Sequence, residues 1–114
     1  MSDDRQLGLL RDMLDSAMAI QAYLRDITYD QFFENQEKQD AVLRRLEIIG
    51  EAASRLSAQT QQLLPELPIR EMRGMRNIIA HDYGEVDLEQ VWETCSRDLA
   101  PLIKTVARCL ESFS

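Results

Sequence analysis

One stretch of the sequence, Arg70–Tyr83, gathers the side chains best suited to chemistry. It holds the only histidine of the chain and three of its eleven arginines. A guanidinium offers phosphate a planar fork of donors and stays charged near neutral pH, and an imidazole can give or take a proton there. Together these groups indicate phosphodiester chemistry without a metal. The alternative is a solvated helix face whose histidine caps the helix end.

The spacing within this stretch predicts a helix from about Ile69 to Ala80 or His81, ended by Asp82–Gly84. At about 100° per residue, apolar and polar side chains fall on opposite arcs. One arc can enter a core while the other presents guanidinium, amide and imidazole groups. The apolar arc holds Met72, Met75, Ile78 and Ile79, and the polar arc holds Arg70, Arg73, Arg76, Asn77 and His81.

The spacing of apolar residues along the whole chain predicts an all-α fold, an antiparallel helical bundle of four longer helices plus one or two short helices. Apolar residues recur at three-and-four spacing over about 5–27, 36–56, 69–81 and 87–111, with short turns at 28–33 and 59–64. The 36–56 helix has a second apolar face, which indicates a second packing partner such as another subunit. Within that helix, Gly50 suits a close approach of another backbone, and Pro101 predicts a kink in the last helix.

Length and composition predict a single domain over residues 1–114 with a real core. No run of apolar residues is long enough to span a membrane, and the acidic N-terminus lacks a secretory signal, so we expect the cytoplasm. The net charge of −7 argues against broad nucleic-acid binding but allows a small basic cleft. The thiols of Cys95 and Cys109 lie about 21 Å apart on one helix, which predicts free buried cysteines.

The helix with the histidine also carries a recognisable motif. The segment from Arg76 to His81 has the Arg-x4-His spacing of HEPN domains, and Tyr83 extends it to the Arg-x4-His-x-Tyr form of HepT-like toxins. The resemblance covers nearly all of the chain, with a departure at Ile69, where many members carry Trp. The flanking segments that resemble this family in order and spacing are Ile49–Ala52, Gly74–Asn77, Val86–Asp87 and Val91–Trp92.

The resemblance implies a metal-independent endoribonuclease toxin of a HepT/MntA-type toxin–antitoxin pair, with no cofactor and with RNA as its substrate. The 2′-OH of RNA would attack the neighbouring phosphate, with Arg76 and His81 as catalytic residues and Asn77 and Arg73 in support. Glu51 has two readings from the sequence. It either pairs with Arg55 four residues later or reaches an arginine of the 69–81 helix.

Partners follow from the same resemblance. One chain supplies one histidine, yet the reaction needs a proton removed and another returned, so a homodimer with a composite site is implied. A nucleotidyltransferase antitoxin (MntA-like) would silence the toxin by AMPylation of Tyr83; no membrane or DNA partner is expected. The alternative is a non-catalytic helical binding module that partners a nucleotidyltransferase or binds a nucleotide, with His81 as a cap.

Overall fold

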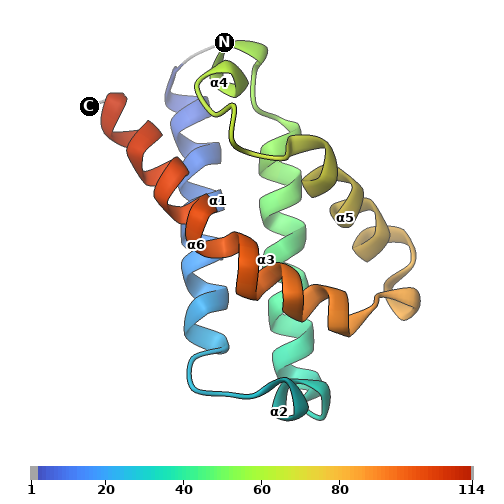
Figure 1. The fold of residues 1–114 in the computed structure, drawn as a ribbon. Helices are drawn as coiled ribbons and strands as arrows, with labels where there is room; N and C mark the ends of the chain where they lie inside the picture. The colour runs from blue at the N-terminus through green and yellow to red at the C-terminus, as the bar shows by residue number, and fades with distance from the viewer. Residues whose placement is uncertain (1–2, 114) are drawn as a thin grey trace.

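The computed structural model describes residues 3–113, and every regular element in this part of the chain is helical (Figure 1). The all-α class, with four longer helices and additional short ones, is therefore confirmed. The long helices are α1 (Asp3–Tyr23), α3 (Gln36–Ser54), α5 (Ile69–His81) and α6 (Leu88–Ser112). The short elements are α2 (Tyr29–Phe33), α4 (Ala58–Gln62) and the 3₁₀ turn η1 (Tyr83–Glu85).

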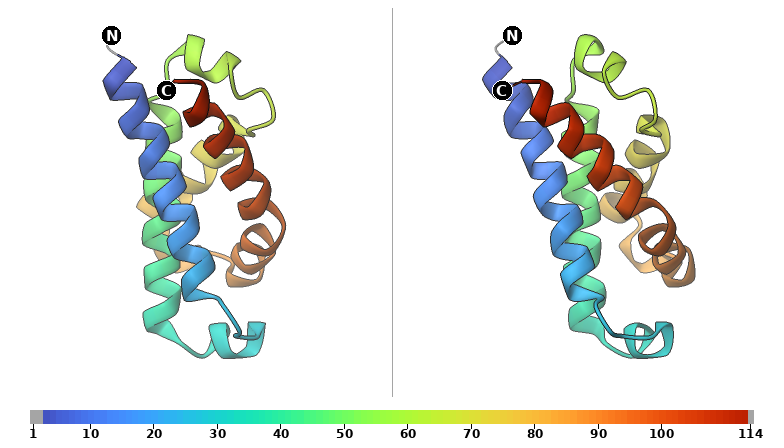
Figure 2. Two further views of the ribbon diagram at one scale, coloured as in Figure 1. Left: turned by 90° about the vertical axis from the view of Figure 1, so that its left-hand side faces the viewer. Right: turned by 60° about the vertical axis from the view of Figure 1, so that its left-hand side comes forward.

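The helices α1 and α3 form a long antiparallel pair, and the other two long helices pack against it (Figures 1 and 2). Helix α5 lies on α3, whereas α6 lies mainly on α1. The start of α1 and the end of α6 both lie at the end of the bundle opposite α2 (Figure 1). No helix among residues 3–113 has both the length and the apolar character needed to cross a membrane.

The core forms where α1, α3 and α6 meet. Its most deeply buried side chains include Leu10, Met13, Ile20, Val42 and Val106. The thiols of Cys95 and Cys109 are buried on α6 and free, as predicted. Burial, with a smaller contribution from Asp98, raises the pKa of the Cys95 thiol to about 12.

Local signals set the helix ends. Thr28 caps α2 in a reciprocal capping box with Gln31. Asp87 caps α6, where its side chain accepts hydrogen bonds from the amides of residues 89 and 90. The first helix ends at Tyr23, earlier than the predicted 27, because Asp26 adopts a φ of 61° that no right-handed helix contains. Figure 1 also shows α6 changing direction near its middle, where Pro101 lies in the sequence, as predicted.

A glycine sets the distance between α3 and α5. A Cβ built on Gly50 would lie 2.5 Å from the Cβ of Arg76 and 2.8 Å from the carbonyl oxygen of Met72. No other residue type fits there, so the predicted close approach of a second backbone at Gly50 is confirmed. Because α1 and α5 of the same chain both pack on α3, the second apolar face of this helix does not by itself require another subunit.

Two glycine substitutions test this packing. We expect Gly50→Ala to lower the free energy of unfolding by about 1–3 kcal/mol, because the added methyl group has no space. Gly74→Ala is the matched control, since a Cβ on Gly74 meets nothing within 4 Å. It should raise stability by about 0.5–1 kcal/mol through helix propensity alone. Urea unfolding of both variants measures the difference, and equal stabilities would contradict the close contact.

Candidate active site

Arg76 lies on the flank of α5 that faces α3. Its guanidinium donates from Nη1 to Oε2 of Glu51, and its side chain is 25% exposed. The Nε atom is buried and has no hydrogen-bond partner among the described residues. The guanidinium is therefore held at the protein surface by one carboxylate, with donors left over for a ligand.

Glu51 links two arginines. Its Oε1 accepts a hydrogen bond of 3.0 Å from Nε of Arg55, while its Oε2 accepts from Arg76. Both readings of Glu51 from the sequence are therefore correct at once. Ion pairs as exposed as these stabilise a fold by only about 0–1 kcal/mol. The main effect of Glu51 is then to fix the direction of the Arg76 side chain.

His81 is the last residue of α5, and its side chain is exposed. It makes no hydrogen bond or ion pair with any residue that the structure describes. The backbone after it is held, because the amide of Asp82 donates to the carbonyl of Ile78 at 2.8 Å. The backbone that carries the imidazole is thus held in place, while the two ring nitrogens have no hydrogen-bond partner among the described residues. It does not bond to the last carbonyls of the helix, as a capping histidine would.

The remaining polar residues of the motif helix are exposed. Arg70, Arg73 and Asn77 have no hydrogen-bond or ion-pair partner in residues 3–113. The structure brings Glu51 to Arg76, but it shows no hydrogen bond or ion pair from Asn77 or Arg73 to either catalytic candidate. Arg76 and His81 are five residues apart, so on one helix they point about 140° apart and lie about 7.5 Å apart along the axis.

Tyr83 lies in η1, just beyond the helix that ends at His81. Its hydroxyl donates a hydrogen bond to Oδ1 of Asp40 on α3. Desolvation raises the pKa of Tyr83 first, and the hydrogen bond and negative charge of Asp40 raise it further, to about 12. The ring remains 48% exposed. Asp40 was not predicted as a site residue, since 43 positions separate it from Tyr83 and no spacing rule connects them.

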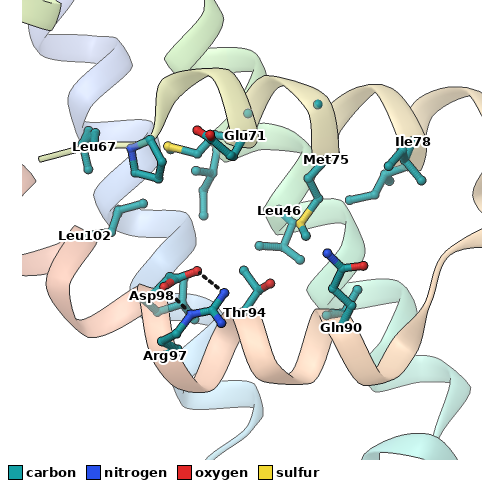
Figure 3. A pocket seen from close by; sticks show the side chains of 18 of the residues that line it. Leu46, Leu67, Glu71, Met75, Ile78, Gln90, Thr94, Arg97, Asp98 and Leu102 are labelled. Atoms are coloured by element: carbon teal, nitrogen blue, oxygen red, sulfur yellow. Dashed lines mark hydrogen bonds and ion pairs between the residues drawn. The ribbon is translucent and has the colours of Figure 1, made fainter.

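An apolar groove runs along the other flank of α5, between α5 and α6, with a volume of about 600 Å³. Figure 3 shows Met75 of α5 and Leu46 of α3 pointing into this space, and Arg97 paired with Asp98 at its α6 edge. Neither Arg76 nor His81 lines the groove. Ile78, predicted to face a core, lies instead at the groove and is 48% exposed, because α5 packs on α3 and not on α6.

The fold, with the Arg-x4-His-x-Tyr motif placed on α5 and η1, is that of an all-α HEPN-like protein. A family model described as "Ribonuclease HepT-like" matches residues 13–109. The chain belongs to this family of HepT-like ribonucleases.

Several relatives carry ribonuclease names. The chain is 37% identical over 93 residues to a Thermococcus cleftensis protein named "Probable ribonuclease HepT", covering 82% of this chain and 84% of the relative. It is 36% identical over 99 residues to a Methanocaldococcus jannaschii protein named as a "Putative RNase", covering 87% of this chain and 91% of the relative.

A second M. jannaschii relative is named "Gamma-glutamylcyclotransferase and putative RNase". It is 36% identical over 104 residues, which are 91% of this chain but 47% of the relative. The chain therefore spans about half the length of that protein. No solved structure shows significant similarity to the chain.

The Tyr83–Asp40 contact predicts a specific titration. In the wild-type protein, phenolate absorbance from Tyr83 should appear with a pKa of about 12. Because this pKa lies above the ordinary value of 10, the stability of the fold should be unaffected by Tyr83 below pH 10 and should fall as the pH rises through about 12, where desolvation and the charge of Asp40 both oppose the phenolate. Asp40→Asn should move the transition towards 10. The difference between the wild type and Tyr83→Phe isolates this one phenol from Tyr23 and Tyr29.

Proposed function

We propose that the chain is a metal-independent endoribonuclease that cleaves RNA by attack of a 2′-OH on the adjacent phosphate. The observation that carries the proposal is the Glu51–Arg76 pair, which fixes a guanidinium on the helix that ends at His81. Helix α5 then carries both a group that can bind phosphate, the guanidinium of Arg76, and a group that can transfer protons, the imidazole of His81. Membership in the HepT-like ribonuclease family supports RNA as the substrate.

In this mechanism, Arg76 binds the scissile phosphate and stabilises the charge that develops on it. The imidazole of His81 takes the proton of the 2′-OH or gives a proton to the leaving 5′ oxygen. The products are a 2′,3′-cyclic phosphate and a 5′-OH. Arg73 and Asn77, both exposed, would contact the RNA backbone beside the reacting phosphate.

We further propose that the active form is a homodimer. Both proton transfers occur in one reaction, yet each chain carries one histidine. Within one chain, Arg76 and His81 also point in directions about 140° apart on the helix. A second copy related by a twofold axis would supply the complementary arginine and histidine in a shared cleft.

The proposed regulation is AMPylation of Tyr83 by an MntA-like nucleotidyltransferase antitoxin. The half-exposed ring is accessible to such an enzyme. An added phosphodiester would bring bulk and negative charge to within two residues of His81 and would repel RNA. The protein would then act as the toxin of a toxin–antitoxin pair.

Two substitutions test the catalytic assignment. His81→Ala and Arg76→Ala should each lower RNA cleavage by about 10²–10⁴-fold, the usual contribution of positioned proton transfer and charge stabilisation. Arg108→Ala is the matched control, because it removes an exposed arginine that pairs with Glu66. Circular dichroism confirms the fold of each variant. Cleavage at the wild-type rate in both site variants would remove the assignment and leave a binding module.

Mixing experiments test the shared site. If each cleft uses residues of both copies, Arg76→Ala and His81→Ala proteins that are unfolded and refolded together should regain part of the cleavage that each lacks alone. Mixed dimers retain one arginine and one histidine in the shared cleft, so the recovery is partial: one proton transfer keeps its imidazole and the other falls to water. Light scattering reports the molecular mass in parallel. A wild-type chain that is monomeric and active would contradict the composite site.

A further inference from the structure

The proposed mechanism of RNA cleavage does not use the contact between Tyr83 and Asp40. This contact joins the turn after the motif helix to the first half of α3. Asp40 is exposed and has no cationic partner among the described residues. Its hydrogen-bond partner there is the phenolic hydroxyl alone. A carboxylate without a counter-ion, directed at one hydroxyl, is arranged to receive that proton.

Any transfer of a nucleotidyl group to Tyr83 must remove this proton. With a pKa of about 12, only about one hydroxyl in 10⁵ is ionised at neutral pH. A route through preformed phenolate is therefore slow. The faster route removes the proton while the new oxygen–phosphorus bond forms, which needs a base in contact with the hydroxyl.

We propose that Asp40 is the base that accepts the Tyr83 proton during nucleotidyl transfer. The Oη atom of Tyr83 forms a bond to the α-phosphorus of a nucleoside triphosphate, and the bond from that phosphorus to the bridging oxygen breaks. Pyrophosphate leaves with the electron pair of the broken bond. The phenolic proton passes to Oδ1 of Asp40 and from there to water.

The geometry favours Asp40 for this role over other groups of the chain. Among the described residues, Asp40 is the one charged group that perturbs the Tyr83 hydroxyl. Because the O–H bond is directed at Asp40 and the ring is 48% exposed, the approach of a nucleotide need not displace the carboxylate. The inference rests on the proposed silencing of the ribonuclease at Tyr83, and it names the residue of the target that assists it.

The test compares Asp40→Asn with Glu37→Gln. Asparagine keeps an acceptor oxygen for the Tyr83 hydroxyl but takes up no proton. Glu37 is an exposed carboxylate about one turn earlier on α3, and the Tyr83 hydroxyl donates to Asp40 and not to Glu37. Each full-length protein is incubated with the proposed nucleotidyltransferase and MgATP labelled at the α-phosphate. Label on the Tyr83 peptide is followed over time, with Tyr83→Phe as the blank and RNA cleavage as the check of folding.

The two possible effects of Asp40 have opposite signs. Removing its charge lowers the pKa of Tyr83 only in part, because desolvation, the largest cause of the shift, remains; this alone would speed the reaction by less than about 100-fold. Losing a base slows it by about 10²–10⁴-fold. We expect Asp40→Asn to be labelled more slowly than Glu37→Gln. The labelling rate of Asp40→Asn divided by that of Glu37→Gln should also rise between about pH 6 and pH 9, because without the base the Asp40→Asn protein depends on phenolate. Dividing the two rates cancels the pH dependence of the partner enzyme.

The outcomes separate the two proposals. Labelling of Asp40→Asn that equals or exceeds that of Glu37→Gln, with the same pH dependence, would overturn the role of Asp40 while leaving Tyr83 as the silencing site. A wild-type chain that cleaves RNA yet accepts no label at Tyr83 would overturn both the silencing proposal and this inference.

Discussion

The close approach of α3 and α5 at Gly50 is the constraint on which the candidate site depends. A side chain at this position would collide with Arg76 and with the backbone at Met72, and the two helices would have to separate. The glutamate that follows the glycine in the sequence would then lose its reach to Arg76. One missing methyl group therefore fixes both the packing of the motif helix and the direction of its guanidinium.

Helix α3 acts as the platform for the whole motif region. Because α5 runs antiparallel to it, later motif residues meet earlier positions of α3: Arg76 contacts Glu51, and Tyr83 contacts Asp40. These two contacts hold the helix and the turn that follows it at two points. His81 lies between them in sequence and is left free.

Patterns that repeat along one helix predicted much of this protein, whereas contacts between helices were harder to predict. Helical spacing placed His81 at the end of α5. For Glu51, the sequence offered two kinds of partner, Arg55 on the same helix or an arginine of the 69–81 helix, and the structure shows both. The Tyr83–Asp40 contact depends on the register of α3 against α5, which no local pattern encodes. Ile78 was misplaced for a related reason, because helical spacing defines an apolar face but not which neighbour covers it.

The buried thiols of α6 have a practical consequence. Alkylating reagents attack the thiolate, and burial raises the pKa of both Cys95 and Cys109 while shielding their sulfur atoms. The two native thiols should thus react only slowly with maleimides near neutral pH. A single cysteine introduced on an exposed helix face would carry a fluorophore or spin label selectively, without removal of the native pair. Distances between two such labels would then report how copies of the chain are arranged in solution.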